Sequence, residues 1–322
     1  MSLSAEQKTA AVPSVPEPGA PDVSIIVVSY GTRDMTLACL SSIVRQTHDV
    51  KYEVLVVDNA SPDESDEAMA AAFPSFHHLP QSQNLGFAAA NNLAAKSARG
   101  EYLLLLNPDT VVLDGAVDKL VAFARRRPGA GVWGGRTLFG DGTLNPSSCW
   151  RRQTLWNLFC RGVGLSKLFP NSALFHSESY GGWKRDSVRE VDIVTGCFLL
   201  IGRALWNQLD GFAPEFFMYG EDADLCLRAR AAGSRPAVTP EATIVHYGGA
   251  TEQNDLRKNI RLLAAKALLI KKHSPGVRSL ATALLQLRPL LLMLSSRGAQ
   301  HQKWAAVWAN RGIWSAGRFT AP

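Results

Sequence analysis

The chain has 322 residues, of which 46% are apolar and 19% charged, a composition that excludes a disordered or fibrous protein and suits one large globular domain with an appendage. Its formal net charge of +6 is unevenly spread, because residues 255–322 carry +11 and the other residues carry 22 Lys and Arg against 27 Asp and Glu, a net −5. This asymmetry predicts a basic region that meets an anionic surface. The five scattered cysteines lack CxxC or zinc-ligand spacing and favour a reducing compartment.

The first 21 residues predict a disordered leader. They contain four prolines among small and polar residues, and no charged start followed by an apolar run, so a secretory signal is not expected.

Strand and helix patterns alternate over residues 23–106. The expected strands are 23–29, 52–57, 76–79 and 101–106, and the expected helices are 35–46, 62–72 and 86–98. This alternation predicts an α/β fold with a Rossmann-like, mostly parallel central sheet and helices on both of its faces. Ligands of such sheets bind at the carboxyl ends of the strands.

The middle of the chain is harder to interpret. Residues 136–190 have weak periodicity and are expected to form loops and short helices that make an acceptor wall or lid. Side chains between residues 133 and 190 are candidates for stacking on sugars or binding phosphates, with plain core and surface positions as the alternative: Trp133, Trp150, Trp183, Arg151 and Arg152. From residue 191 the pattern predicts a strand (191–202), a short helix (203–209), a helix starting at 220 and stopping at Gly233, and an edge strand (238–245).

The basic tail contains two amphipathic candidates, 256–273 and 277–296. No run reaches the ~18 apolar residues that span a bilayer, so a segment lying in the membrane interface is favoured. The alternative is a pair of ordinary helices packed on the core with Lys and Arg on a solvated face. Nucleic-acid binding is disfavoured, because the basic residues lie among Leu and Ala rather than among aromatic residues.

Polar residues that suit nucleotide recognition follow the first two strands and precede the third helix. They are Ser29, Tyr30, Gly31, Asp58, Asn84 and Gly86. Asp58 ends its strand where a carboxylate accepts from a base N–H or a ribose hydroxyl. Each piece alone is as well explained by an Asx turn or a loop stop, but their joint order along one parallel sheet favours a site.

Asn107-Pro108-Asp109 follows a buried strand and predicts a metal site. A diphosphate leaving group develops negative charge, which a divalent cation stabilises, and Mg²⁺ or Mn²⁺ prefers hard carboxylate oxygens such as those of Asp109. Asn107 offers an amide oxygen or reaches a ribose hydroxyl. The alternative is a turn in which Asp109 caps the next helix.

Two further motifs carry candidate chemistry. Glu221-Asp222 starts a helix, where a carboxylate stays ionised and can take the proton of an acceptor hydroxyl, although both acids could instead cap the helix. His246 leads into Tyr247-Gly248-Gly249-Ala250-Thr251, so it is a candidate ligand of the same metal or a donor to the diphosphate. A lone histidine is more often structural.

The combination of motifs resembles the family 2 glycosyltransferases, enzymes of the GT-A fold. The matching segments, in the family's order between residues 23 and 251, are VSIIVVSYGT, EVLVVDNASPD, NLGFAAANN, GEYLLLLNPDT, VTGCFLLIGR, LDGFAPEFFMYGEDADLCLRARAAG and VHYGGAT. The resemblance implies that Asp58 contacts the base, Asp109 binds metal and diphosphate, and His246 contacts one of them. It also implies that Asp222 is the catalytic base, supported by Glu221.

One departure from the family pattern points to a branch. The metal motif is often Asp-x-Asp, whereas here Asn107 stands first, which leaves one carboxylate and predicts weaker metal affinity. The Asn-Pro-Asp form resembles the rhamnosyltransferase-like branch, which builds O-antigen and other cell-surface glycans from dTDP-rhamnose.

We therefore expect an inverting, metal-dependent (Mg²⁺ or Mn²⁺) glycosyltransferase that uses a dTDP- or UDP-sugar and a glycan or polyprenyl-diphosphate-linked acceptor. The expected organisation is a leader (1–21), a catalytic domain (22–254, with a nucleotide-binding half 22–110 and an acceptor-binding half 111–254) and a helical tail (255–322). The expected location is cytoplasmic, peripheral at the inner face of the membrane. The alternatives are a sugar nucleotidyltransferase and a non-catalytic membrane or polyanion binder; an NAD-dependent dehydrogenase is disfavoured because no GxGxxG follows the first strand.

Overall fold

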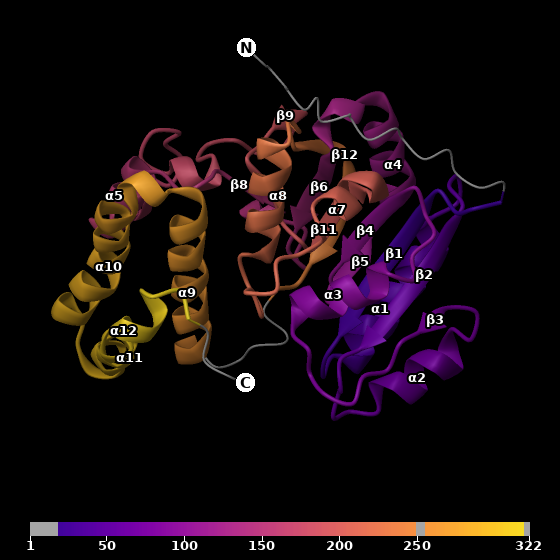
Figure 1. Ribbon diagram of the computed structural model, residues 1–322, viewed down its shortest axis with the longest axis horizontal. Helices are drawn as coiled ribbons and strands as arrows, with labels where there is room; N and C mark the ends of the chain where they lie inside the picture. The colour runs from indigo at the N-terminus through magenta and orange to yellow at the C-terminus, as the bar shows by residue number, and fades with distance from the viewer. Residues whose placement is uncertain (1–18, 249–254, 319–322) are drawn as a thin grey trace, which may run out of the picture.

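The computed structural model describes residues 19–248 and 255–318, and Figure 1 shows a central sheet flanked by helices, with a cluster of C-terminal helices at one side. Within the described part of the chain the central sheet has ten strands, and its main path runs β3-β2-β1-β4-β11-β6-β12-β5. The strands of this path are β3 (His77–His78), β2 (Tyr52–Asp58), β1 (Val23–Ser29), β4 (Tyr102–Leu106), β11 (Phe198–Gly202), β6 (Val132–Leu138), β12 (Ala237–His246) and β5 (Thr110–Val112). β7 (Leu144–Asn145) pairs with β6, and β9 (Arg189–Glu190) pairs with β12.

The parallel part of the sheet brings three strand ends together. β1 pairs in parallel with β2 and with β4, in a register that sets Ser29 opposite Asp58 and Val27 opposite Leu106. The Val-, Ile- and Leu-rich sequences of these strands are buried along almost their whole length, as strands covered on both faces require. The strands expected in this region are confirmed, although the one expected over 76–79 is reduced to β3.

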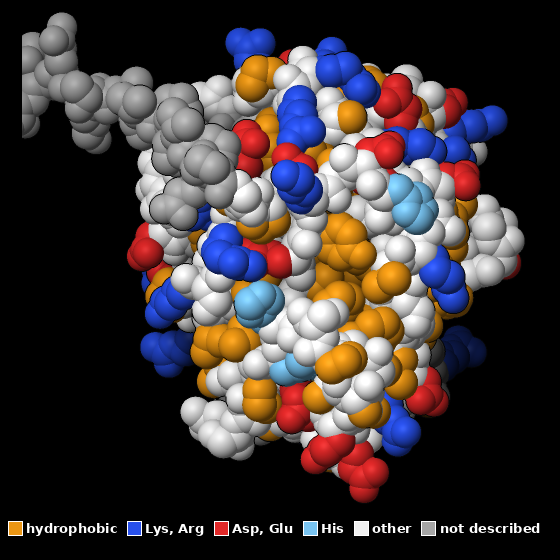
Figure 2. Space-filling model, turned by 90° about the vertical axis from the view of Figure 1, so that its right-hand side faces the viewer, with side chains coloured by type: hydrophobic (Ala, Val, Ile, Leu, Met, Phe, Trp, Pro, Cys, Tyr) orange, Lys and Arg blue, Asp and Glu red, His pale blue; other side chains and the backbone are white. Residues whose placement is uncertain are grey.

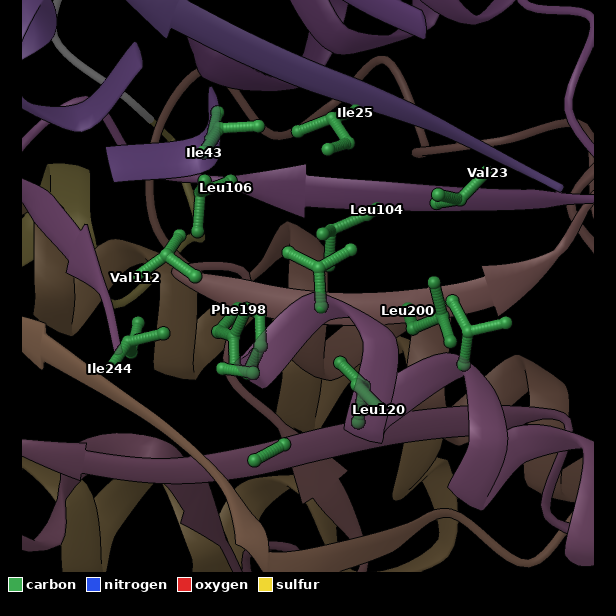
Figure 3. Close-up of a cluster of buried hydrophobic side chains, with 14 of the residues drawn as sticks. Val23, Ile25, Ile43, Leu104, Leu106, Val112, Leu120, Phe198, Leu200 and Ile244 are labelled. Carbon is green, nitrogen blue, oxygen red and sulfur yellow. The ribbon is translucent and has the colours of Figure 1, made fainter. Parts of the chain in front are cut away.

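Helices cover both faces of the sheet, as expected. α1 (Arg33–Gln46), α2 (Ser65–Ala72) and α4 (Ala116–Arg126) pack on the face that carries Ile25 and Leu104, and Figure 3 shows Ile43 of α1 and Leu120 of α4 pointing into this cluster. α3 (Phe87–Ala95), α7 (Arg203–Gln208) and α8 (Glu221–Ala231) pack on the other face. Each fully buried Val, Leu or Ile side chain contributes roughly 1.5–3 kcal/mol, so these two clusters account for most of the stability of the domain.

The region after residue 110 is more regular than expected. Strand β6 lies inside the sheet, and α5 (Leu155–Gly162), α6 (Leu165–Leu168) and β8 (Cys149–Trp150) follow it. Gly134 and Gly135 interrupt the apolar pattern of β6, which is why its sequence resembles a loop. A Cβ on Gly135 would lie 2.2 Å from the carbonyl oxygen of Ala242, so glycine here permits close packing of neighbouring strands.

Two strand expectations were wrong. The run 191–202 is not one strand, because it breaks at residues 195–197 into β10 (Ile193–Val194), which pairs with β8 in a separate small sheet, and β11. The strand expected at an edge, β12, lies between β6 and β5, since the short strand β5 pairs with its outer side.

The tail folds into α9 (Asp255–His273), α10 (Arg278–Ser295), α11 (Gly298–Ala309) and α12 (Arg311–Trp314). Side chains of α9, α10 and α12 share a third apolar cluster with Leu158 of α5. α9 also contributes Leu268 and Leu269 to the core beside α8, so this part of the tail packs on the catalytic core. The division at residue 254 and the leader remain predictions, and residues 1–18 lie outside the described residues.

α10 corresponds to the second amphipathic candidate and includes Pro289 within the helix. Within the described residues, 275–295 is the one helical segment long and apolar enough to cross a membrane by length and composition, with 17% of its most apolar window buried, whereas none was expected. Figure 2 shows the opposite side of the molecule, at the right of Figure 1, where acidic, basic and apolar side chains are mixed.

Candidate functional site

A cavity of about 520 Å³ opens at the carboxyl ends of β1 and β4. Four parts of the chain line it: these strand ends, residues 193–197, the start of α8, and a side formed by α9 with residues 150–178. The expected site residues on its wall are Tyr30, Asn84, Asn107, Asp109, Glu221, Asp222 and His246. The cavity lining does not include the expected residues Ser29, Gly31, Asp58 and Gly86.

Asp222 is held in place by backbone amides. Its Oδ2 accepts from the Gly196 N–H at 3.0 Å, and its Oδ1 accepts from the Ala223 N–H at 2.7 Å. Gly196 lies in the segment 195–197 that separates β10 from β11, and its free N–H can therefore bind this carboxylate. Each oxygen keeps a lone pair that can accept from a further hydroxyl.

Glu221 lies beside Asp222 and is 6% exposed, with Oε2 buried and unpartnered among the described residues. Burial, and then the charge of Asp222, raises the pKa of Glu221 to about 8. Burial also raises the pKa of Asp222, although the backbone hydrogen bonds oppose it. Two adjacent buried carboxyls share protons, and the better-solvated, amide-bonded Asp222 is the one that ionises first.

Sheet pairing brings His246 to the Asn107–Asp109 turn. His246 lies opposite Thr110 in the β12–β5 ladder, and its Nε2 is 3.4 Å from Asp109 Oδ1 and 3.4 Å from Asn107 Nδ2. The Asn107 N–H donates to the Cys197 carbonyl at 3.1 Å. Neighbouring residues of one loop, Gly196 and Cys197, thus hold Asp222 and this turn on a common wall.

The turn fits a divalent cation that is shared with a substrate. The carboxylate of Asp109 and the amide oxygen of Asn107 are oxygen ligands that suit Mg²⁺ or Mn²⁺, and they leave coordination positions for phosphate oxygens and water. Within the described residues no group of three or more His, Cys, Asp or Glu gathers as a complete metal cage. Burial lowers the pKa of His246, but Cys197 and Asp109 outweigh it and raise the pKa to about 10, so a metal ion on His246 would displace a proton.

The residues expected to recognise the nucleotide mostly shape loops. The Ser29 hydroxyl is fully buried against that of Thr36 at 2.9 Å, and Asp58 Oδ2 accepts from the Ser61 N–H as in an Asx turn. Asp58 Oδ1 stays buried without a partner among the described residues, and Asp58 is not on the cavity lining. Asn84 Oδ1 accepts from Asn59 Nδ2 at 3.0 Å.

Glycine roles are also conformational. Gly31 and Gly86 have positive φ angles of 61° and 79°, and a Cβ on Gly86 would lie 2.5 Å from the Phe217 carbonyl oxygen. Gly86 therefore lets the loop before α3 approach the segment that leads to α8. Tyr30, 38% exposed, is the aromatic side chain that this end of the sheet presents to the cavity.

The other candidate aromatic and basic residues separate clearly. Trp150 and Arg151 line the cavity. Trp133 is core, with its Nε1 donating to the Arg127 carbonyl. Trp183 is not part of the cavity lining. The guanidinium carbon of Arg185 lies 4.8 Å from the centroid of its ring.

Several lining residues were not predicted from the sequence, and they share the property of lying far along the chain from the motifs at the strand ends. They include Arg161, Glu178, Lys258, Lys266 and Cys197. The charge asymmetry of the tail indicated that basic residues there could matter, but it did not indicate which of them line the cavity. Residues 249–251 of the His246 motif lie outside the described residues.

Comparisons with known proteins agree with this geometry. The model of Glycosyl transferase family 2 matches residues 24–192, slightly more than half of the 322 residues. The chain is 30% identical over 249 residues to the O-antigen biosynthesis protein RfbC of Myxococcus xanthus, covering 74% of this chain and 18% of RfbC. It is 27% identical over 237 residues to the N-acetylglucosaminyl-diphospho-decaprenol L-rhamnosyltransferase of Mycobacterium tuberculosis, covering 69% of this chain and 75% of that protein.

A solved structure shares the fold. The mannosyltransferase PcManGT from Pyrobaculum calidifontis, in complex with GDP-Man and Mn²⁺, superimposes with a TM-score of 0.56 at 17% identity, covering 96% of this chain and 87% of that one. The GT-A expectation is thereby confirmed for the fold.

Proposed function

The chain belongs to Glycosyl transferase family 2 and is a glycosyltransferase with rhamnosyltransferase-like relatives, and from this we propose a specific reaction for it. The reaction is a metal-dependent transfer, with inversion, of a deoxyhexose such as rhamnose from a dTDP- or UDP-sugar to a lipid-diphosphate-linked glycan. The observation that carries it is the common cavity of Asp109 and Asp222, joined by residues 196 and 197.

Asp222 is the general base of this proposal. A direct displacement needs a group that removes the proton of the attacking hydroxyl as the new bond forms. The amides of Gly196 and Ala223 fix the carboxylate and keep it ionised, while burial raises its basicity above that of a surface aspartate. In this mechanism the acceptor hydroxyl attacks the sugar directly and no enzyme group acts as a nucleophile, so no covalent intermediate forms.

Asp109, His246 and Asn107 hold the diphosphate end of the donor. A divalent cation bound here would stabilise the negative charge on the leaving nucleoside diphosphate. PcManGT was solved with Mn²⁺, which supports a divalent ion for this fold and leaves the choice between Mg²⁺ and Mn²⁺ open. We assign the base and ribose of the donor to the end of the cavity that Tyr30 lines, and Asp58 is proposed to contact the base.

The acceptor assignment is supported by the Mycobacterium tuberculosis relative, whose name gives a decaprenol diphosphate carrying N-acetylglucosamine. A polyprenyl-linked acceptor resides in a membrane, so we propose a peripheral enzyme at the cytoplasmic face, held there by the basic tail. The apolar and largely unburied segment 275–295 supports a tail that meets the bilayer.

The test is a transfer assay with purified protein, a panel of nucleotide sugars, Mn²⁺ or Mg²⁺, and an alkyl-diphosphate N-acetylglucosamine acceptor. We expect dTDP-rhamnose to give a disaccharide product by mass spectrometry. Asp222→Asn should lower kcat by about 10³-fold and leave donor binding unchanged, because general base catalysis is lost while the donor wall is intact.

The control is Asp186→Asn, the same change at an exposed position away from the cavity, which should keep parental turnover. Near-normal turnover of Asp222→Asn would remove this residue as the base. Release of pyrophosphate from a sugar phosphate and a nucleoside triphosphate would instead identify a nucleotidyltransferase.

A further inference from the structure

One side of the cavity has an excess of positive charge that the proposed mechanism does not use. This side, which we term the tail-side wall, consists of Arg151, Arg161, Glu178, Lys258 and Lys266. Four cations face one carboxylate. They come from residues 150–178 and from α9, and Figure 1 shows α8 between these tail helices and the central sheet.

Glu178 neutralises only part of that charge. It pairs with Arg161 Nη1 at 3.1 Å and with Lys266 Nζ. Burial alone would raise the pKa of Glu178, but Lys266 and Arg161 outweigh it and hold the pKa at about 2. Glu178 is therefore ionised at neutral pH, and its single charge is shared between two cations, which leaves the wall positive.

Arg151 and Lys258 complete the excess. The Arg151 guanidinium lies 5.0 Å from the centroid of the Tyr180 ring, and Lys258 is half-buried on the first turns of α9. No carboxylate pairs with either side chain in the part of the chain that the structure describes. Two unneutralised cations beside a shared carboxylate suit a phosphate or diphosphate group, which accepts charge-assisted hydrogen bonds from Arg and Lys.

An apolar groove adjoins the wall. A smaller hollow of about 70 Å³ lies between α5, α9 and α10 and shares Arg161, Leu262 and Lys266 with the main cavity. Most of its lining is apolar, and these side chains are Leu158, Leu262, Leu263, Leu284, Leu285, Pro289 and Trp304. Asn259 and Arg288 also line it. The positive wall thus continues into a mainly apolar surface that favours hydrocarbon.

We propose that the tail-side wall is the acceptor subsite, where Arg151 and Lys258 bind the anionic group of an amphiphilic acceptor whose hydrocarbon chain enters the apolar groove. This inference rests on the proposed function, since it requires the accepting sugar to sit between the wall and Asp222. It assigns acceptor specificity to residues that lie outside the strand-end motifs. A neutral acceptor that carries the same sugar would lack the contact with Arg151 and Lys258.

The test measures binding of farnesyl diphosphate, farnesol and inorganic pyrophosphate to the full chain by calorimetry, without added metal so that the Asp109 side does not attract the diphosphate. The variant is Arg151→Gln with Lys258→Gln, which removes two charges and leaves the Glu178 pairs intact. The matched control is Lys271→Gln with Arg278→Gln, two charges on exposed tail positions outside the cavity. Circular dichroism checks that each variant is folded.

We expect the cavity variant to bind farnesyl diphosphate at least tenfold more weakly than the parent, and the control to stay within about twofold. Farnesol binding should be unchanged, and pyrophosphate should bind the parent more weakly than farnesyl diphosphate because it cannot use the groove. Parental affinity in the cavity variant, or an equal loss in the control, would overturn the subsite. Equal affinity for pyrophosphate and farnesyl diphosphate would overturn the role of the groove.

A separate titration with dTDP and Mn²⁺ distinguishes this inference from the proposed function. If the cavity variant loses dTDP binding as well, the cations belong to the donor and the acceptor subsite is refuted. If the parent does not bind dTDP but farnesyl diphosphate behaves as expected, the donor assignment fails and the anionic subsite stands.

Discussion

The two walls of the cavity are built in different ways. The donor wall is made from the ends of β1, β2 and β4, three parallel strands that lie within residues 23–106 and whose register places their final residues side by side. The tail-side wall is assembled from distant segments, as in the pair Glu178–Lys266, 88 residues apart. The first wall is a consequence of local patterns in the sequence, whereas the second depends on how the tail packs on the core.

The largest expected effect lies in the donor wall. Asp109→Asn removes the only carboxylate of the Asn107–Asp109 turn, so transfer should fall by about 10²–10³-fold in kcat/KM. Thermal stabilisation by dTDP should also lose its dependence on Mn²⁺, because the variant cannot bring cation and diphosphate together. Manganese-dependent stabilisation equal to that of the parent would show that the metal binds elsewhere.

The tail-side wall is expected to depend on an anchor. Asp224, fully buried on α8, accepts from His273 Nε2 at 2.9 Å and from Arg228 Nε at 2.7 Å, and Lys272 Nζ is 3.2 Å away. Burial would raise the pKa of Asp224, but these partners outweigh it and hold the pKa at about 2. Asp224→Asn should therefore lower the free energy of unfolding by about 2 kcal/mol at pH 7.

The pH dependence of that effect has a definite sign. A carboxyl whose pKa is lower in the folded state stabilises the protein above the unfolded pKa, and this contribution is lost as pH falls from about 4 to 2. Urea unfolding of parent and Asp224→Asn should therefore differ at pH 7 and converge toward pH 3. A constant difference across this range would mean that the ion pairs are not its cause.

A smaller effect is expected at the junction of the two walls. Glu221 has a pKa raised to about 8, so its ionisation in the folded state costs free energy as pH rises from about 5 to 8. Glu221→Gln should raise the free energy of unfolding at pH 8 and change it little at pH 5. Transfer at pH 7 should stay within about tenfold of the parent, because the neutral form of Glu221 is the one the amide replaces.

The result that would contradict this is a variant destabilised equally at both pH values. Glu221 would then act through hydrogen bonds of its charged form, and the proton sharing between Glu221 and Asp222 would be disproved.

The smallest effect on catalysis is expected on α10, outside both walls. Leu280 and Leu294 are 54% and 68% exposed. Their double substitution to Glu should leave turnover of a water-soluble acceptor unchanged, yet reduce sedimentation with anionic liposomes several-fold, because it removes apolar surface and adds negative charge. Val44→Glu on α1, at an exposed apolar position 44% accessible, is the control and should keep liposome binding. Unchanged binding of the α10 variant would remove this helix from the membrane contact.

The same contrast explains what the sequence could predict. The strands that end at Ser29, Asp58 and Leu106 were identified because each combines a β-rich apolar run with a polar stop, and the helix start at Glu221 follows a glycine. Asp109, Asp222 and His246 could thus be assigned to one site before any coordinates. Their individual roles remain predictions.

What escaped prediction was fixed by non-local contacts. Gly134 and Gly135 resemble loop residues in the sequence, but close approach of Ala242 and Phe198 demands them inside β6. The break at 195–197 depends on Asp222, an acid 26 residues further on that accepts from the Gly196 N–H. Lys258 is one of many basic residues in the tail, and only the packing of α9 on the core brings it to the cavity.

The most direct test of the account is the anomeric configuration of the product, determined by nuclear magnetic resonance from a reaction with a donor of known configuration. A donor and an acceptor held on the two walls, with Asp222 between them as the proposed base, predict a single displacement and hence a product with the inverted configuration. A product that keeps the configuration of the donor would contradict this mechanism, because retention requires a second displacement on an enzyme nucleophile, which the mechanism does not include.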